Sequence, residues 1–192
     1  KYAGTRHNIG WLTADGFAAK HNSEFREVRD ICLLSEIKFK RQSVVLAKPT
    51  TYMNDSGRAV KYLCRKFSCK PENVIIIVDE YNFPVGKIHV KNSGSNGGHN
   101  GTASIIEDLG TEAFIRMRCG IGKDFPPGGM VDYVLENFPA AQQEEVKLMI
   151  DKSCTALEHI MTTNLTTAMS DINSGRLWKE GEGKEKPTSL SL

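Results

Sequence analysis

The chain has 192 residues, and its 25 lysines and arginines against 23 acidic residues give a net charge of +2. This length predicts one domain whose core needs no disulfide or metal, and the charge balance excludes binding to nucleic acid through overall charge alone. Any such binding must come from a local basic patch. No apolar run approaches the roughly 20 residues of a membrane span, so we expect no membrane partner.

Five cysteines are scattered along the chain and form no Cys-x-x-Cys pair. Their odd number and spacing favour reduced thiols in a cytoplasmic compartment over a disulfide framework or a zinc site. The sequence begins at Lys1 without an initiator methionine. An upstream targeting segment, and with it an organellar location, is therefore the alternative.

Apolar residues recur with helical or strand periods along most of the chain. In chain order they predict a helix at 9–20, strands at 31–37 and 43–47, a helix at 60–67, strands at 74–78 and 87–91, a helix at 101–109, a strand at 113–121 and a helix at 139–161. This order, without repeat or linker, predicts a single α/β domain over residues 1–173 with a mixed sheet. Gly, Lys, Glu, Pro and Ser dominate from Ser174, which predicts a disordered tail over 174–192.

The strand at 74–78 consists of five consecutive β-branched residues, and Asp79 and Glu80 follow it directly. Such a run predicts a strand buried on both faces. Ligands of open α/β sheets bind beyond the carboxyl ends of the strands, so these two carboxylates are expected near a site. A solubilising acidic turn is the alternative.

Two other strands alternate apolar and basic residues. We expect Lys91 on the solvent-facing side of the strand at 87–91, and Arg116 and Arg118 together on one face of the strand at 113–121. The sequence therefore predicts two basic strand faces.

Three polar segments each adjoin a predicted strand end or helix start: Thr-Arg-His-Asn at 5–8, Met-Asn-Asp-Ser-Gly at 53–57 and Gly-His-Asn-Gly at 98–101. Taken alone, His7 is more often a capping or surface residue than a catalyst, and Asn54 is more often a helix N-cap. The third segment ends a glycine-rich stretch, which lacks the Lys-Ser/Thr ending of a Walker loop.

Together with Asp79, these segments make the chain resemble the bacterial-type peptidyl-tRNA hydrolases, in the same order and up to about Arg176. The resemblance implies a flavodoxin-like twisted mixed β-sheet flanked by helices. It also implies cleavage of the ester that joins a peptide to the 3′ ribose of its tRNA, by a cytoplasmic monomer that recycles tRNA and rescues ribosomes.

The resemblance assigns roles residue by residue. His7 matches the catalytic histidine of the family and Asp79 its paired carboxylate, so we expect the two side chains within hydrogen-bond reach. The residues expected to bind substrate or line the groove are Asn54, Asn100, Met53, His99 and Tyr2. An imidazole base held by a carboxylate suits direct attack by water, and we expect no covalent intermediate, metal or cofactor.

Lys91 and Arg118 match the basic pair with which the family grips a tRNA phosphate; two solvated strand charges are the alternative. The chain departs from the family in two places. The family's first strand, which ends Gly-Leu-Gly-Asn-Pro-Gly, would precede Lys1, and without it we expect unpaired backbone beside the strand at 74–78 and less stability and turnover. Asn82 stands where many members have an acid.

Two further classes of function remain open. Chloroplast splicing factors share this fold, so an RNA-binding module without turnover is one alternative. A flavodoxin-like binder of a nucleotide cofactor is the other, and it rests on the fold alone. The presence of His7, Asp79, Asn54 and Asn100 favours the hydrolase.

Overall fold

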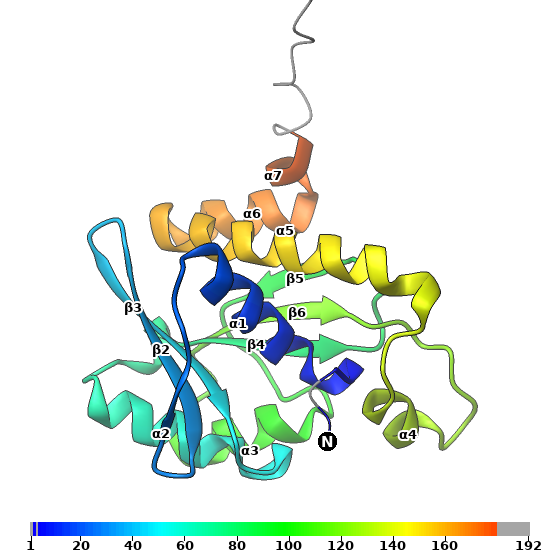
Figure 1. Cartoon of the computed structure of the whole chain (residues 1–192), viewed down its shortest axis with the longest axis horizontal. Helices are drawn as coiled ribbons and strands as arrows, with labels where there is room; N and C mark the ends of the chain where they lie inside the picture. Colours follow the sequence, from blue (N-terminus) through cyan, green and yellow to red (C-terminus); the bar gives the residue numbers. More distant parts are fainter. Residues whose placement is uncertain (1, 3, 180–192) are drawn as a thin grey trace, which may run out of the picture.

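The computed structural model describes residue 2 and residues 4–179 (Figure 1). Its strands are β1 (Arg26–Val28), β2 (Cys32–Phe39), β3 (Gln42–Pro49), β4 (Ile75–Glu80), β5 (Ile88–Lys91) and β6 (Ile115–Gly120). Its α-helices are α1 (Ile9–Lys20), α2 (Ser56–Lys66), α3 (Asn100–Leu109), α4 (Met130–Leu135), α5 (Gln143–Thr162), α6 (Leu165–Ser174) and α7 (Arg176–Lys179). Two short 3-10 helices, η1 (Arg6–Asn8) and η2 (Met53–Asp55), precede α1 and α2.

The strands form two sheets. β1, β2 and β3 make an antiparallel sheet, and the second sheet has the order β4-β6-β5, with β4 parallel and β5 antiparallel to β6. The single α/β domain is confirmed, but the expected single sheet is divided because β3 does not pair with β4. Within the described residues β4 pairs with β6 alone, so its other edge has no strand beside it. None of the described helices is both long and apolar enough to span a membrane.

Helices cover both sides of the second sheet. Figure 1 shows α5 and α6 along one side and α2 and α3 along the other. In β4, Ile75 and Ile77 pack into the large core cluster that includes α1, α5 and α6, whereas Ile76 packs with Ile105 of α3. The prediction that this strand is buried on both faces is therefore confirmed, although only Ile76 among its isoleucines is more than nine-tenths buried.

Two glycines allow the close contacts that place the loops around the end of β4. A Cβ atom on Gly10 of α1 would lie 2.4 Å from the carbonyl oxygen of Ile77, and one on Gly57 of α2 would lie 2.2 Å from that of Ser104 in α3. Only glycine lets backbones approach this closely. As a result η1 lies beside β4, and η2 lies beside the start of α3.

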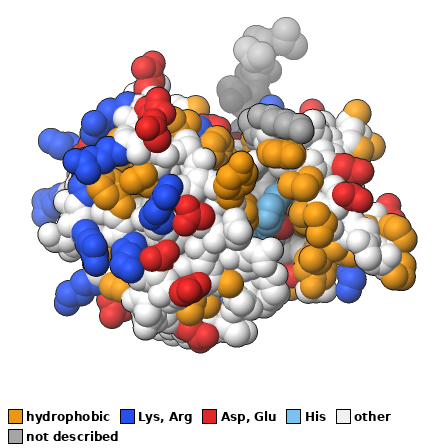
Figure 2. Space-filling view, turned by 90° about the horizontal axis from the view of Figure 1, so that it is seen from below, with side chains coloured by type: hydrophobic (Ala, Val, Ile, Leu, Met, Phe, Trp, Pro, Cys, Tyr) orange, Lys and Arg blue, Asp and Glu red, His pale blue; other side chains and the backbone are white. Residues whose placement is uncertain are grey.

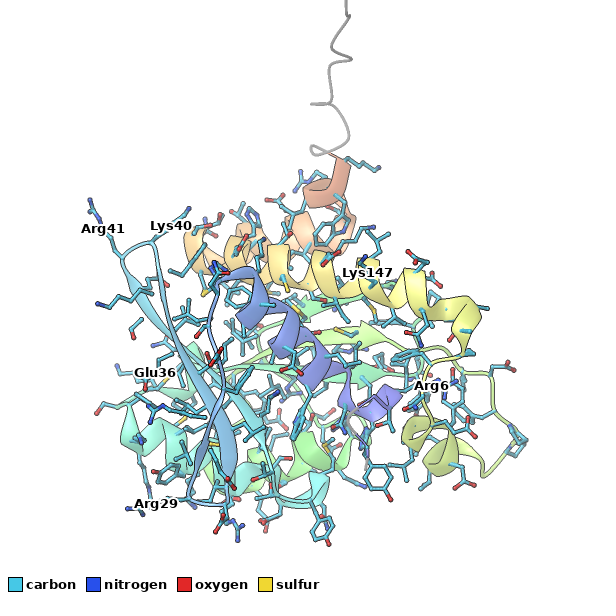
Figure 3. All side chains as sticks on the ribbon, in the orientation of Figure 1. Arg6, Arg29, Glu36, Lys40, Arg41 and Lys147 are labelled. Carbon is cyan, nitrogen blue, oxygen red and sulfur yellow. The ribbon has the colours of Figure 1, made fainter. Side chains whose placement is uncertain are left out.

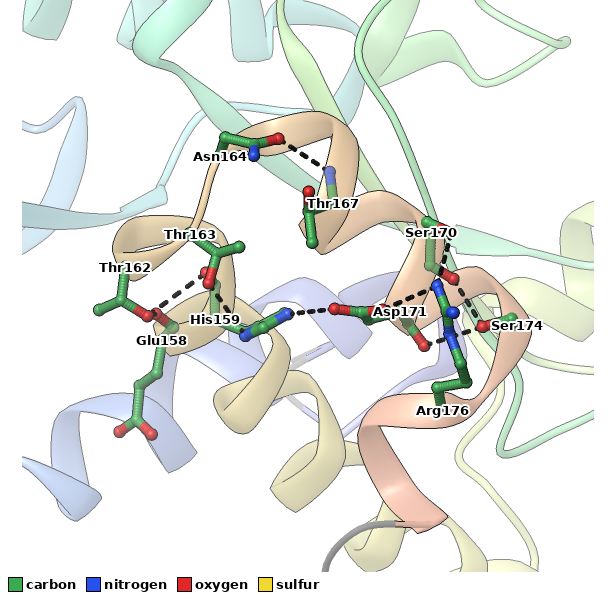
Figure 4. Close-up of polar contacts among 10 residues, drawn as sticks. All are labelled: Glu158, His159, Thr162, Thr163, Asn164, Thr167, Ser170, Asp171, Ser174 and Arg176. Carbon is green, nitrogen blue, oxygen red and sulfur yellow. Dashed lines mark hydrogen bonds and ion pairs between the residues drawn. The ribbon is translucent and has the colours of Figure 1, made fainter.

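The carboxyl-terminal helices correct the expected boundary of the tail. Residues 174–179 were assigned to the tail from composition, but Ser174 ends α6, Gly175 caps it and 176–179 form α7. Leu177 and Trp178 pack against the core, and Arg176 Nη2 lies 3.0 Å from Asp171 Oδ1. Figure 4 shows that Asp171 also accepts a hydrogen bond at 3.0 Å from His159, which joins α6 to α5. The rest of the expected tail, residues 180–192, lies outside the described residues.

Candidate active site

A groove of about 420 Å³ lies where η1, η2, the end of β4, the start of α3 and α4 meet. Its lining includes His7, Met53, Asn54, Asp79, Glu80, Lys91, His99, Asn100, Arg116, Arg118, Met130 and Val131. Figure 2 shows a histidine surrounded by hydrophobic side chains on this face of the molecule. The groove thus gathers segments that lie far apart in the sequence, as the resemblance implied.

The His7–Asp79 pair has the expected geometry. Nδ1 of His7 lies 2.8 Å from Oδ1 of Asp79 across 72 residues of sequence, which confirms the prediction that the two are within hydrogen-bond reach. The Asp79 side chain is 4% exposed and that of His7 is 19% exposed. Because the ionised carboxylate can only accept, Nδ1 of His7 carries the proton, and its Nε2 is left as the basic nitrogen.

His99 is a second donor to the same carboxylate oxygen, with Nε2 3.0 Å from Oδ1 of Asp79. Its Nδ1 accepts the backbone N–H of Thr102 at 3.2 Å, so His99 is also the N-cap of α3. Since that N–H needs an acceptor, the ring proton is on Nε2 and is donated to Asp79. The cap of one helix therefore fixes the orientation of the carboxylate.

The pKa of Asp79 follows from these contacts. Burial by itself raises the pKa of the carboxyl, but hydrogen bonds from His7 and His99 outweigh burial and lower the pKa to about 2. Asp79 is therefore ionised near neutral pH. An ionised carboxylate keeps the His7 proton on Nδ1 and stabilises the ring once Nε2 is protonated.

The same three side chains have ligand types that zinc prefers, and their donor atoms all lie within 4.8 Å of one another. Hydrogen bonds, however, occupy Oδ1 of Asp79, Nδ1 of His7 and both ring nitrogens of His99. Both ring nitrogens that face Asp79 are assigned protons, and the remaining nitrogen of His99 accepts from Thr102. The donor set thus fits a proton-transfer site without an ion.

The other expected substrate residues differ in their placement. Asn54 and Asn100 are exposed and line the groove, as does Met53; no capping hydrogen bond from Asn54 is present within the described residues. Tyr2 is 45% exposed and lies outside the groove lining, and its carbonyl accepts from Asn8 Nδ2 at 2.7 Å. Two neutral amides thus line the same groove as the histidines.

Three cations line one end of the groove: Lys91, Arg116 and Arg118. Lys91 stands directly opposite Arg116 in the ladder between β5 and β6. Burial, followed by the charges of Arg116 and Arg118, lowers the pKa of Lys91. Like charges on facing positions destabilise a sheet, and an arrangement that brings them together suits a bound anion.

The burial of Arg116 corrects the expectation of a solvent-facing strand. Its side chain is 2% exposed, its guanidinium lies 4.6 Å from the Phe114 ring, and Nη1 donates to the Ser95 carbonyl at 2.5 Å. The loop that carries Ser95 covers this face of β6. Nε and Nη2 of Arg116 have no hydrogen-bond partner within the described residues.

Glu80 balances part of this positive charge. Its Oε2 accepts from Arg118 at 2.7 and 3.1 Å, and its Oε1 accepts from the backbone and side-chain nitrogens of Asn82 at 3.0 and 2.9 Å. Burial raises the pKa of Glu80, but the bonds from Asn82 and Arg118 outweigh it and lower the pKa. The amide at position 82 therefore acts as a donor to Glu80, a role that an ionised acid could not fill.

Sequence patterns missed two parts of the site. Arg6 is 6% exposed because its guanidinium stacks at 3.9 Å on the Tyr133 ring and donates to the Tyr133 carbonyl, which ties η1 to α4. The short helix α4 then supplies exposed apolar side chains, Met130 and Val131, to the groove. The apolar pattern of α4 is too short to be recognised from sequence alone.

These features define the class: an α/β protein in which a histidine hydrogen-bonded to a buried carboxylate shares one groove with three cations. The profile of the peptidyl-tRNA hydrolase family matches residues 1–180. The chain is 42% identical to a peptidyl-tRNA hydrolase of Chloroflexus aurantiacus and 38% identical to one of Dehalococcoides mccartyi; each alignment covers 90% of this chain and 93% of the relative. The crystal structure of peptidyl-tRNA hydrolase from Acinetobacter baumannii superposes with a TM-score of 0.84 at 29% identity, covering 90% of this chain and 88% of that one. This chain belongs to the peptidyl-tRNA hydrolase family.

Proposed function

We propose that this protein hydrolyses the ester bond between a peptide and the 3′ ribose of tRNA, with His7 as the general base. The observation that carries the proposal is the 2.8 Å contact between His7 and the buried, ionised Asp79. This contact leaves Nε2 of His7 at the groove without a hydrogen bond to any of the described residues. A poised base of this kind has no use in a protein that only binds RNA.

The base acts on water. Nε2 of His7 takes a proton from a water molecule as the water oxygen attacks the ester carbonyl, and Asp79 stabilises the resulting imidazolium. As the bond from the carbonyl carbon to the 3′ oxygen of the ribose breaks, the imidazolium returns that proton to the leaving oxygen, and His7 is neutral again. Within the described residues no Ser, Thr or Cys side chain is hydrogen-bonded to His7 or His99, so no nucleophile is activated for a covalent intermediate. Positioned base catalysis of this kind contributes about 10²–10⁴ in rate.

Two neutral side-chain amides bind the substrate in this mechanism. Asn54 and Asn100 reach the groove from η2 and from the first residue of α3. An amide can donate to the oxyanion that forms on the ester carbonyl and can accept from peptide N–H groups, without repelling either. We assign these two residues to substrate binding, together with Met53 and His99 along the wall of the groove.

The cationic end of the groove takes a phosphate of the tRNA. Lys91 and Arg118 supply the charge, and Glu80 holds the guanidinium of Arg118 in a fixed orientation. Phosphate contacts carry no sequence information, which suits an enzyme that accepts many tRNAs. The protein would thus return tRNA to translation and rescue stalled ribosomes. We propose that it does so as a cytoplasmic monomer, because one chain supplies the groove and all five cysteines are free thiols.

The test is hydrolysis of an N-acyl-aminoacyl-tRNA, followed by release of the acyl-amino acid. The wild-type protein should release it, and His7→Ala should be slower by about 10²–10⁴. His21→Ala is the matched control, because His21 also lies beside a carboxylate, Glu158, but outside the groove. Equal rates for the wild-type protein and His7→Ala would refute the assignment of the base, and tRNA binding without hydrolysis would support the RNA-binding alternative.

A further inference from the structure

The α2 helix and the residues after it form an unusually basic segment. Residues 56–70 contain five lysines and arginines and no acidic residue, whereas the whole chain has a net charge of +2. The segment therefore carries +5, and the rest of the chain carries −3, the difference between +2 and +5. This is the local basic patch that the overall composition conceals.

The basic residues of α2 share one face. They and one tyrosine recur at the spacing i, i+3, i+4, i+7, i+8, which places them on one side of a helix: Arg58, Lys61, Tyr62, Arg65 and Lys66. The other side packs inward, where Val60 contacts the cluster beneath α3 and Leu63 contacts the core of the first sheet. On the basic face Arg58, Arg65 and Lys66 are exposed, whereas Tyr62 is half-buried against the core of the first sheet.

Two of these cations are neutralised locally. Arg58 lies 3.4 Å from Asp55, and Lys61 lies 3.2 Å from Asp108. Within residues 4–179, by contrast, neither Arg65 nor Lys66 lies within ion-pair distance of a carboxylate, and both are exposed.

A third exposed cation joins them from another element. Arg29, in the turn between β1 and β2, lies 5.9 Å from the Tyr62 ring, and Lys66 lies 5.9 Å from the same ring. The tyrosine thus holds two cations on one surface by cation–π contact. We name Arg29, Arg65 and Lys66 the α2 cation cluster.

Helix α2 leads from the groove to the cluster. The α2 helix begins directly after η2, which contributes Asn54 to the groove, and Lys66 is twelve residues further along. At 1.5 Å per helical residue this separation is about 18 Å. Figure 2 shows lysines and arginines gathered at one side of the face that also displays a histidine next to hydrophobic side chains.

We propose that the α2 cation cluster binds the sugar–phosphate backbone of the tRNA some distance from the 3′ end that occupies the groove. This proposal rests on the proposed function. Exposed, unpaired guanidinium and ammonium groups are the groups that bind RNA phosphates, and they do so without regard to sequence. Binding energy from this remote part of the substrate would hold the ester in the groove.

The experiment compares two triple variants that lose the same charge. The test variant carries Arg29→Gln, Arg65→Gln and Lys66→Gln; glutamine keeps the side-chain stem and a good helix propensity. The control variant carries the same change at the exposed residues Lys40, Arg41 and Lys147. Figure 3 shows Lys40 and Arg41 at the opposite end of the β2–β3 hairpin from Arg29, and Lys147 on α5.

The test variant should raise the KM for N-acyl-aminoacyl-tRNA roughly tenfold or more at low salt and leave kcat unchanged. In a plot of the logarithm of tRNA affinity against the logarithm of salt concentration, the slope should become less steep by about 2 to 3. Each lost phosphate contact contributes about 0.9 to that slope. Hydrolysis of an acyl-aminoacyl adenosine, which lacks the tRNA body, should not change. The control variant should stay within about twofold of wild type on both substrates.

Three results would overturn the proposal: an unchanged KM in the test variant, an equal loss in the control variant, or an equal loss on the adenosine substrate. The second would mean that net charge alone is responsible, and the third that the residues support the fold. If the wild-type protein binds tRNA through the cluster but hydrolyses neither substrate, the proposed function fails and this inference stands. Melting curves of each single variant identify any unfolded protein, and the folded ones still test the cluster.

Discussion

The contact between α1 and β4 sets the distance between His7 and Asp79, and Gly10→Ala tests it. A Cβ on Gly10 would lie 2.4 Å from the carbonyl oxygen of Ile77, whereas ordinary contact begins near 3.4 Å. The oxygen belongs to the backbone of β4 and cannot move aside as a side chain could. The start of α1 must therefore move outward by about 1 Å.

That movement carries His7 with it, because η1 leads directly into α1. The 2.8 Å contact with Asp79 would lengthen by as much as the helix moves, to a distance at which the hydrogen bond is lost. A misplacement of about 1 Å in a catalytic group can cost about 100-fold in rate. We therefore expect Gly10→Ala to lower kcat on N-acyl-aminoacyl-tRNA by about 10- to 100-fold, with little change in tRNA binding.

Gly16→Ala is the matched control in the same helix. Its Cβ would meet Cγ2 of Ile150 at 2.7 Å, a side-chain methyl that can shift, and it lies at the end of α1 away from His7. Both changes raise helix propensity by about 1 kcal/mol, so neither weakens α1 itself. A kcat within about twofold of wild type for Gly10→Ala, or an equal fall in kcat for both variants, would refute the positioning argument.

Three further predictions concern the charges of the site. The pKa of Asp79 is lowered from 3.8 to about 2, so its ionised form stabilises the fold above pH 3.8, and this stability is lost as pH falls through about 2. Urea unfolding measures the free energy of unfolding at about pH 5 and at about pH 2. The decrease between the two pH values should be larger by roughly 2 kcal/mol in wild type than in Asp79→Asn. A chelator should leave hydrolysis unchanged, since hydrogen bonds occupy Oδ1 of Asp79, Nδ1 of His7 and both ring nitrogens of His99; a loss of activity restored by zinc would assign a metal there. Lys91→Ala and Arg118→Ala should each weaken tRNA binding and reduce the slope of log affinity against log salt concentration by about 1, while hydrolysis of acyl-aminoacyl adenosine stays nearly unchanged. An equal loss of hydrolysis on both substrates would mean that these residues support the fold.

The sequence predicted most elements of the fold because their patterns are local. The helix expected at 9–20 is α1, and the buried strand expected at 74–78 is β4, which begins at Ile75 and continues through Asp79 and Glu80. Local patterns fail where burial depends on distant segments. Alternation in β6 placed Arg116 and Arg118 on one face correctly, but it could not show that the loop bearing Ser95 covers the first of them.

Local sequence patterns are also insufficient to predict the candidate site. The pairing of His7 with Asp79 was expected from the resemblance to a family, since nothing in the spacing of 72 residues predicts a contact. The separation of the strands into two sheets is likewise a matter of tertiary contact. Helix α1 packs against both sheets. No local sequence pattern in β3 indicates that this strand does not pair with β4.

His99 shows that fold and chemistry use the same side chain. Histidine is a poor N-cap compared with Ser, Thr, Asp or Asn, so helix stability alone gives no reason for its place at the start of α3. A second function does: Nδ1 caps the helix while Nε2 donates to Asp79, a reach that the shorter capping side chains lack. The cap fixes which nitrogen bears the proton, and that proton helps to hold the Asp79 oxygen toward His7. The suboptimal cap is therefore explained by the carboxylate, and the low pKa of the carboxylate is explained in part by the cap.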